Sequence, residues 1–332
     1  MNAAMLVAVL VPGIVAAALI AILLRTSSVR HLADHPNERS LHSRPTPRIG
    51  GLGIAAGFFP IAMSYADGPG ALILACALAL ALVSLVDDMR GLPVVLRLSA
   101  HLLAAIAVMS AIAYVPAGAE AWRWLAWLAV LLAVVWVTNL YNFMDGSDGL
   151  AGTMALVGFG AYAAAAALAG HAALALASLA VASASAGFLA FNFPPARVFM
   201  GDAGSIPLGF LAGALGVLGV VAGAWPAAFP AVAFSPFIVD ATATLLRRLV
   251  RGERVWQAHR SHYYQRLVLS GWNPRRLVLA AGGLMLAAAA SALVLARSGL
   301  MLQCGIIFFW VVFYALLLPA IDRKTRTTNL AR

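Results

Sequence analysis

The sequence predicts an all-α, polytopic integral membrane protein with about eleven transmembrane helices, its N-terminus outside and its C-terminus in the cytoplasm. Three observations predict this fold class. The chain is 63% hydrophobic and only 10% charged, whereas soluble domains are roughly 45 to 50% apolar and about 25% charged. The apolar residues form runs long enough to cross about 30 Å of hydrocarbon as helices. The basic residues gather in alternate connections between these runs.

The apolar runs define the expected helices, and we treat residues 1–332 as one polytopic domain. The runs lie near residues 3–24, 50–65, 70–86, 98–115, 122–138, 150–169, 172–190, 206–224, 227–246, 277–296 and 300–319. The second run is short, and whether it crosses the membrane decides on which side every later connection lies. The first run is expected to stay in the protein, because a cleaved signal carries basic residues before its apolar stretch, whereas Arg25 follows this one.

The basic residues predict the orientation. With the N-terminus outside, 20 of the 22 Lys and Arg residues lie on the inner side, and only Arg123 and Arg297 lie on the outer side. The positive-inside rule therefore places the basic side in the cytoplasm and favours an odd number of spans. These residues are spread over short membrane-flanking loops, so the formal charge of +10 does not predict nucleic-acid binding. Cys76 and Cys304 fall inside apolar runs and are not expected to form a disulfide or bind a metal.

Acidic residues cluster on the predicted inner side. Six of the twelve lie at or just inside the ends of apolar runs: Asp87, Asp88, Asp145, Asp148, Asp202 and Asp240. A carboxylate at such a depth is unfavourable unless it meets a cation, a partner or water, so acids there are candidates for function. The alternative is that each is a helix-end residue at the interface. The adjacent pair in VSLVDDMRGL is the sharpest candidate, since two neighbouring carboxylates are best tolerated beside a divalent cation or with one raised pKa.

The segment NLYNFMDGSDGLAG carries amides and carboxylates at every third position: Asn139, Asn142, Asp145 and Asp148. One straight helix cannot present all four on one face, because each step of three slips by about 60° around the axis. A break near Gly146 and Gly149 would let the side chains converge beside a wet cavity. Amides and carboxylates together suit a nucleotide or a sugar. The alternative is an ordinary polar turn.

A third inner element, FMGDAGSIP, places Asp202 in a glycine-flanked turn that leads into a helix, with Ser205 as a cap and Pro207 in the first turn. A helix N-terminus attracts anions, so Asp202 could share a site with phosphate through a bridging Mg²⁺. Asp240 precedes Arg247 by seven residues and is interpreted as structural more readily than catalytic.

Two basic loops are candidates for phosphate binding. The loop QAHRSHYYQRL offers His259, Arg260 and His262 to a diphosphate. Zinc binding by the two histidines is disfavoured, because no cysteine or third histidine lies nearby. The first inner loop, HPNERSLHSRPTPRIGG, is rich in Arg, His and Pro and contains Arg48. Both loops are also explained by the positive-inside rule alone.

Taken together, these elements resemble the polyprenyl-phosphate N-acetylhexosamine-1-phosphate transferases, the superfamily that includes the MraY and WecA enzymes. The resemblance covers roughly residues 34–266 and rests on five ordered elements: DHPNERSLHSRPTPRIGG, the Asp87–Asp88 pair, NLYNFMDGSDGLAG, FMGDAGS and HRSHYYQRL. It implies a ten- or eleven-helix enzyme of the inner membrane, whose cytoplasmic cleft takes a UDP-N-acetylhexosamine and a polyprenyl phosphate. The products would be UMP and a polyprenyl diphosphate sugar. A homodimer is left open.

The resemblance also implies roles. Asp87, Asp88 and Asp202 are similar to the family's acidic catalytic set, with Asp202 and Asp88 as supports for Mg²⁺, for which Mn²⁺ is an alternative. Asn139, Asn142, Asp145 and Asp148 are similar to nucleotide-sugar contacts. His259, Arg260 and His262, with Arg48 from the first loop, are similar to the diphosphate-binding residues. One aspartate of the pair would either accept the proton of the lipid phosphate or attack first, and we favour the direct displacement.

Two differences from the MraY-type pattern bear on which sugar the enzyme would use. The last motif reads HRSH without the run of histidines expected of MraY-type enzymes, and the single lysine, Lys324, lies in the C-terminal tail. We therefore expect the WecA-like, O-antigen-initiating branch, with N-acetylglucosamine or a 6-deoxy relative as the sugar. The competing function is a transporter or flippase, which would place its charges near mid-membrane on broken helices.

Overall fold

The computed structural model describes residues 3–26, 32–34, 45–112, 120–255, 257 and 259–330. Residues 35–44, which carry most of the first inner loop, lie outside this range. Over the described part the chain forms thirteen helices and one antiparallel pair of two-residue strands, β1 (Ala33–Asp34) and β2 (Thr46–Pro47). The prediction of an all-α, polytopic membrane protein is confirmed.

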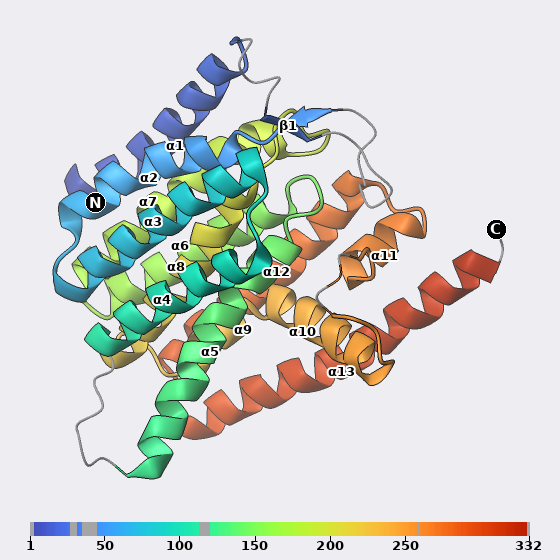
Figure 1. Cartoon of the computed structure of the whole chain (residues 1–332). Coiled ribbons are helices and arrows are strands. Elements are labelled where there is room, and N and C mark those ends of the chain that lie inside the picture. Colours follow the sequence, from blue (N-terminus) through green and yellow to red (C-terminus); the bar gives the residue numbers. More distant parts are fainter. Residues whose placement is uncertain are drawn as a thin grey trace.

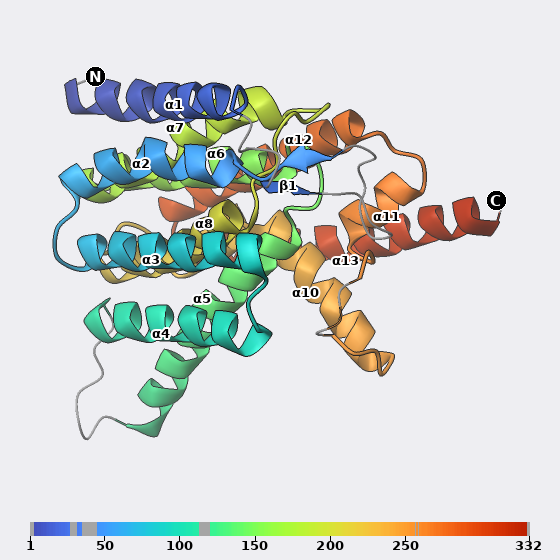
Figure 2. The ribbon, with the colours of Figure 1, turned by 45° about the horizontal axis from the view of Figure 1, so that its top comes forward.

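The helices begin and end close to the predicted runs. They are α1 (Ala3–Leu23), α2 (Gly50–Tyr65), α3 (Gly68–Arg90), α4 (Val94–Ile112), α5 (Ala121–Phe143), α6 (Leu150–Leu168), α7 (Ala172–Asn192), α8 (Asp202–Val221), α9 (Ala228–Ala233), α10 (Ser235–Val250), α11 (Tyr263–Leu269), α12 (Pro274–Ala296) and α13 (Leu300–Leu330). Figure 2 shows α1, α2, α3 and α4 running side by side, while α10 leaves the bundle at a steep angle.

Fewer helices than predicted are long and apolar enough to span a membrane by themselves. Nine helices in the described ranges meet that criterion, against the eleven expected from the sequence. The second run forms α2, which has only 16 residues. The ninth run, 227–246, is divided between α9 and α10, and the division falls just before Pro236 in the first turn of α10. Proline has no backbone N–H and its ring clashes with the preceding turn, so it favours a break there.

Although short, α2 runs the full height of the neighbouring helix α8. At its start, Gly50 N–H donates to Phe199 O (2.9 Å) and Gly51 N–H to Met200 O (2.8 Å), just before α8 begins. At its end, Ala66 lines a small cavity together with Ala222, which follows the last residue of α8. The chain then returns through α3, which ends beside the start of α8 again. The second run therefore passes from one end of the bundle to the other.

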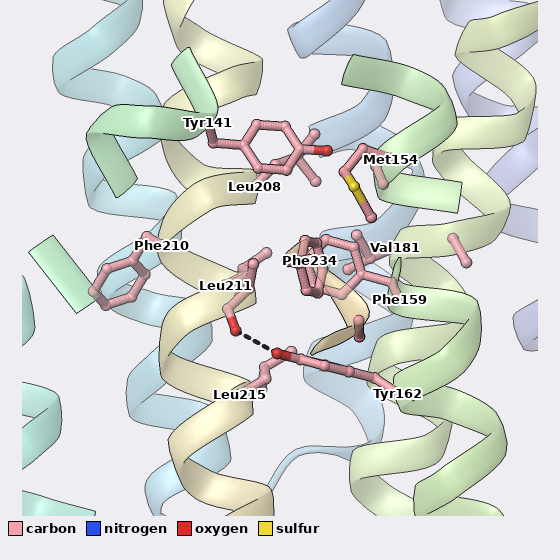
Figure 3. Packing of buried hydrophobic residues seen from close by; sticks show 14 of the residues in the cluster. Tyr141, Met154, Phe159, Tyr162, Val181, Leu208, Phe210, Leu211, Leu215 and Phe234 are labelled. Atoms are coloured by element: carbon pink, nitrogen blue, oxygen red, sulfur yellow. Dashed lines mark hydrogen bonds between the residues drawn. The ribbon is translucent and has the colours of Figure 1, made fainter. Parts of the chain in front are cut away.

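The most deeply buried helices are α6, α7 and α8. In α7 and α8, 72% of an 18-residue apolar stretch is buried within the protein. The corresponding share is 11% in α13, which lies at the periphery (Figure 1). Figure 3 shows how Phe159, Tyr162 and Phe234 pack against Leu211 and Leu215 of α8. The Tyr162 hydroxyl donates to the Ala212 carbonyl (2.8 Å), so its one polar atom is satisfied inside this apolar core.

The starts of α2 and α8 approach so closely that a side chain would not fit between them. A Cβ atom at Gly51 would lie 2.4 Å from the backbone nitrogen of Gly204. Because the carboxylate-bearing end of α3 lies against the same turn, this close approach brings three of the predicted inner elements to one end of the bundle.

Candidate active site

Asp88 joins the end of α3 to the start of α8. Its Oδ2 accepts a hydrogen bond from the backbone N–H of Ala203 (3.1 Å), and its Oδ1 lies 3.6 Å from Nη1 of Arg48. The turn before α8 depends on Gly201, which has φ +72 and whose added Cβ would lie 3.0 Å from Asp88 Oδ2. Arg48 in turn donates to Asp34 Oδ1 (2.6 Å). The first inner loop, α3 and the FMGDAGS turn therefore meet at one carboxylate.

Asp87 faces the other side of the α3 terminus, toward α4. Its Oδ1 accepts from Leu92 N–H (2.6 Å) and its Oδ2 accepts from Arg97 Nη1 (2.9 Å). The same Arg97 nitrogen lies 3.7 Å from Asp202 Oδ2. Of the three carboxylates, Asp202 has the most exposed side chain, at 27%, so it is the most available to a ligand. Arg97 thus holds Asp87 and Asp202 near one another against their mutual repulsion.

Asp87, Arg97 and Asp202 border a cavity of about 380 Å³, whose lining does not include Asp88 or Arg48. Its polar lining consists of Ser84, Asp87, Arg97, His101, Asn139, Asn142, Asp202, Gln257, His259, His262 and Gln265. Apolar side chains line it as well, and three of these, Val94, Leu98 and Phe143, are more than 40% exposed on the protein surface. The cavity therefore combines a polar interior with an apolar rim, and its volume lies within the range of small-molecule sites, roughly 300 to 1,000 Å³.

The structure confirms the predicted helix break in NLYNFMDGSDGLAG, since α5 ends at Phe143 and α6 begins at Leu150. Asn139 and Asn142 line the cavity from the last turn of α5, and the Asn142 side chain lies within hydrogen-bonding reach of Asp202. Asp145 follows in the turn. Burial raises the pKa of the Asp145 carboxyl well above its usual range, and the nearby carboxylates Asp202 and Asp88 raise it further.

Asp148 occupies a different position from the other three. Its Oδ2 accepts from the backbone N–H of Ala196 (2.9 Å), in the connection that leads toward α8, and like Asp145 it is not among the residues that line the cavity. Gly149 beside it donates its N–H to Asn192 Oδ1 (2.8 Å). These contacts hold two inner connections together. A direct contact between Asp148 and a nucleotide sugar remains a prediction.

The HRSHYYQRL loop places two of its three predicted residues in the cavity lining, His259 and His262. Asp240 supports the loop, because its carboxylate accepts the backbone N–H groups of Tyr263 and Tyr264, each at 2.9 Å. This is the structural position that the sequence favoured for Asp240. Burial lowers the pKa of His259, and together with the smaller effects of the neighbouring His262 and Arg248 it brings that pKa to about 4. Arg260 is exposed and is not part of the cavity lining, so its diphosphate contact remains a prediction.

The donor set fits Mg²⁺ by its chemistry. Asp88, Asp145, Asp202 and Asn142 supply hard oxygen ligands, and the carboxylates repel one another where they approach. Across the described ranges, no three or more His, Cys, Asp or Glu side chains converge as a preformed metal site. Mg²⁺ is usually held by one or two carboxylates together with water and substrate phosphates, so an incomplete protein shell is consistent with this ion.

Two lining residues of α4 were not identified as site residues from the sequence. These are Arg97, which the positive-inside rule already explains as a basic residue at a span boundary, and His101. His101 is 5% exposed, lies within reach of the Asn139 side chain, and has no hydrogen-bond partner at its buried Nδ1 in the described structure. The signal in the sequence is their spacing: two basic side chains four residues apart, about one helical turn, at the start of an apolar run.

Comparison with known proteins agrees with this geometry. Residues 71–220, which run from the first turn of α3 to the last turn of α8, match the family model described as glycosyl transferase family 4. The probable undecaprenyl-phosphate N-acetylglucosaminyl 1-phosphate transferase of Bacillus subtilis is 29% identical over 314 residues, covering 89% of this chain and 87% of that protein. The decaprenyl-phosphate N-acetylglucosaminephosphotransferase of Mycolicibacterium smegmatis is 27% identical and covers 74% of this chain and 70% of its own.

The similarity to pentapeptide transferases is more local. The phospho-N-acetylmuramoyl-pentapeptide-transferase of Bacillus pumilus is 34% identical, but over 119 residues, which cover 34% of this chain and 35% of that protein. The expectation of the WecA-like rather than the MraY-like branch is therefore confirmed. The match over α3 to α8 and the two long alignments make this chain similar to glycosyl transferase family 4 and to its N-acetylglucosamine 1-phosphate transferases.

Proposed function

We propose that this multi-pass membrane protein transfers N-acetylglucosamine 1-phosphate from UDP-N-acetylglucosamine to a polyprenyl phosphate, with release of UMP. The observation that carries the proposal is the carboxylate cluster at one end of the bundle: Asp87 and Asp202 both approach Arg97, and Asp88 accepts from the backbone N–H of Ala203 next to Asp202. The names of the relatives that align over most of the chain support the choice of sugar and acceptor.

The cavity suits a reaction between one soluble and one membrane-bound substrate. Its polar interior offers amide, imidazole and carboxylate groups to a nucleotide sugar, while exposed Val94, Leu98 and Phe143 form an apolar rim for a lipid tail. Phosphoryl transfer needs the two phosphates held in line and the developing charge neutralised, more than it needs covalent chemistry from the protein. The gathering of acids at one end of the bundle, and not at its middle, disfavours the transporter alternative.

Asp202 and Asp88 would hold Mg²⁺, and Asp145 and Asn142 would offer further oxygen donors near Asp202. Mg²⁺ would supply positive charge to the diphosphate of the nucleotide sugar. One aspartate of the Asp87–Asp88 pair accepts the proton of the lipid phosphate, whose oxygen then displaces UMP directly. His259 and His262 bind the diphosphate from the far side of the cavity, assisted by Arg260 and Arg48.

The polar end of the bundle faces the cytoplasm of the cell, where UDP-sugars are made. The product, a polyprenyl diphosphate sugar, would initiate a surface polysaccharide such as O-antigen, or a cell-wall glycan. A homodimer is compatible with this activity.

Purified protein in detergent tests the proposal. It would be incubated with Mg²⁺, polyprenyl phosphate and, in separate reactions, a panel of UDP-sugars, and UMP release would be measured. We expect release with UDP-N-acetylglucosamine that depends on both the acceptor and Mg²⁺. Absence of UMP release with every sugar of the panel, from protein that remains folded, would contradict the proposed activity. Preference for a 6-deoxy sugar would keep the reaction class and correct the sugar.

A further inference from the structure

A second cavity lies between α10, α11, α12 and α13, apart from the active site. Its volume is about 420 Å³, and its walls are mainly apolar, with Phe237, Leu267, Leu284, Phe313 and Leu317 among the lining residues. It shares no lining residue with the active-site cavity. We call it the α12–α13 groove. Such an apolar space beside the lipid-exposed helix α13 is suited to an acyl chain.

Polar contacts at two levels hold α13 in place and so define the groove. Near the membrane interior, the hydroxyls of Ser235 and Tyr314 lie 2.9 Å apart. Toward the C-terminal end of α13, Asp322 accepts from Arg247 (2.7 Å) and from Arg266 (2.5 Å). Figures 1 and 2 both show α11 beside this part of α13. The groove is thus framed by specific contacts, and the negative charge of Asp322 is already matched by two arginines.

Positive charge gathers at one edge of the groove. Trp272 and Lys324 both line it, and the Lys324 ammonium lies 4.8 Å from the centre of the Trp272 ring. The guanidinium of Arg276 lies 4.3 Å from the same ring. Arg275 and Arg323 are the immediate sequence neighbours of these two cations. Tryptophan with flanking cations is typical of the membrane interface, where basic side chains meet lipid phosphates.

The short helix α11 separates the groove from the active site. His262 and Gln265 line the active-site cavity, whereas Tyr263, Tyr264 and Leu267 line the groove. The neighbouring rings of His262 and Tyr264 stack with centroids 5.9 Å apart. A molecule that fills the groove would therefore pack against the same seven-residue helix that carries the diphosphate-binding loop.

We propose that the α12–α13 groove binds an anionic phospholipid of the inner leaflet, with its phosphate at Lys324, Trp272 and Arg276 and one acyl chain in the groove. Bound lipid steadies α11 and thereby the HRSH loop. The two cations select an anionic headgroup over a zwitterionic one. The acceptor lipid is a different occupant, because its reacting phosphate has to reach the carboxylates on the other side of α11.

Fluorescence quenching by brominated lipids tests binding directly. The full-length protein would be reconstituted in phosphatidylcholine nanodiscs that contain either brominated phosphatidylglycerol or brominated phosphatidylcholine. The quenching due to Trp272 is the difference between the wild type and Trp272→Phe. We expect Trp272 to be quenched at lower mole fractions of the anionic lipid, with a loss of about fivefold in apparent affinity for each of Arg276→Gln and Lys324→Gln.

Two controls decide what the groove recognises. Arg123→Gln, at the opposite end of the bundle, should leave the quenching unchanged, and the double variant Arg276→Lys with Lys324→Arg should retain the preference because both charges remain. Equal quenching by the two lipids would overturn the proposal. So would displacement of the brominated phosphatidylglycerol by polyprenyl phosphate, because the groove would then belong to the acceptor.

The effect on turnover rests on the proposed function. We expect phosphatidylglycerol to raise UMP release by the wild type, and Arg276→Gln with Lys324→Gln to abolish that increase without changing release in pure phosphatidylcholine. Quenching with no change in turnover would overturn the coupling through α11. An inactive wild type would contradict the proposed function, while the quenching experiment would still decide whether the groove binds the lipid.

Discussion

Arg97 Nη1 lies 2.9 Å from Asp87 Oδ2, and the same nitrogen approaches Asp202 Oδ2 at 3.7 Å. One guanidinium therefore offsets the repulsion between carboxylates from two helices, α3 and α8. We expect Arg97→Gln to lower kcat on the order of a hundredfold, the size associated with misplacement of reacting groups by about 1 Å. Arg97→Lys keeps the positive charge but loses the planar guanidinium group, so its kcat should lie between those of the wild type and Arg97→Gln. Wild-type kcat in folded Arg97→Gln would contradict this role.

The three clustered carboxylates should each be needed for turnover. Asp87→Asn, Asp88→Asn and Asp202→Asn keep the side-chain size but remove the charge that supports Mg²⁺ or accepts a proton. We expect each to lower UMP release at least about a hundredfold. Asp67→Asn, at the other end of the bundle, is the matched control and should retain activity. Near-normal release by any of the three purified variants would remove that residue from the catalytic set.

Most of this cluster was predictable from the sequence, because the relevant signals are local. Apolar runs of fixed length ending in Asp87–Asp88 or beginning after Asp202 place both elements at membrane boundaries without any tertiary information. The sequence does not indicate which polar residues of a motif lie near the carboxylate cluster and which make structural contacts elsewhere. Asp148 and Asp145 are equivalent in the motif, yet Asp148 accepts the Ala196 N–H, while Asp145 lies near Asp202 and Asp88. That distinction arises only from the packing of connections far apart in the chain.

The number of helices long enough to span a membrane differed from the predicted number for a comparable reason. Hydropathy detects runs but not their backbone geometry, and the run 227–246 contains Pro230 and Pro236, the second of which lies at the start of α10. The role of Arg97 was missed because a basic residue at a span boundary is already explained by the positive-inside rule. Only the distances to Asp87 and Asp202 identify it as a site residue.

Arg260 is expected to contact the diphosphate when substrate binds, although its side chain is exposed in this structure. Bidentate phosphate binding prefers the planar guanidinium fork, whereas a topology signal needs only positive charge. Arg260→Lys should therefore preserve expression and orientation but raise KM for the UDP-sugar. Arg251→Lys, another exposed position in the same basic loop, should leave KM unchanged. An unaltered KM for Arg260→Lys would reduce Arg260 to a topology signal.

His259 predicts a pH dependence of substrate binding. Burial and the nearby His262 and Arg248 lower its pKa to about 4, so the imidazole is neutral at pH 7 without substrate. A bound diphosphate favours the imidazolium and raises that pKa, so binding takes up a proton. The affinity contributed by His259 is then present below the pKa of the bound state and is lost as pH rises through it.

KM for the UDP-sugar should accordingly fall as the pH is lowered from 8 toward 6, and His259→Gln should flatten this dependence. Calorimetry in buffers of different ionisation enthalpy would show proton uptake by the wild type and less by the variant. A wild-type KM that is independent of pH, or the same slope in His259→Gln, would contradict the assignment.

The last prediction concerns orientation, on which every substrate assignment depends, because a UDP-sugar made in the cytosol meets only residues on that side. The structure brings the predicted inner elements to one end of the bundle, and α2 runs the full height of α8. The distribution of basic residues predicts that this end faces the cytoplasm. Single cysteines at Ser261 and Ser270 would mark it, and cysteines at Asp67 and Ser298 would mark the opposite end.

The background for this test lacks Cys76 and Cys304, both free thiols. In intact cells, a membrane-impermeant thiol reagent should label the Asp67 and Ser298 positions at once and leave the Ser261 and Ser270 positions unlabelled until the membrane is opened. The two positions at each end control for one another, since a single buried cysteine would fail to react on either side. Labelling at position 261 in intact cells would contradict the predicted topology, because the loop with His259 and His262 would then face away from its nucleotide substrate.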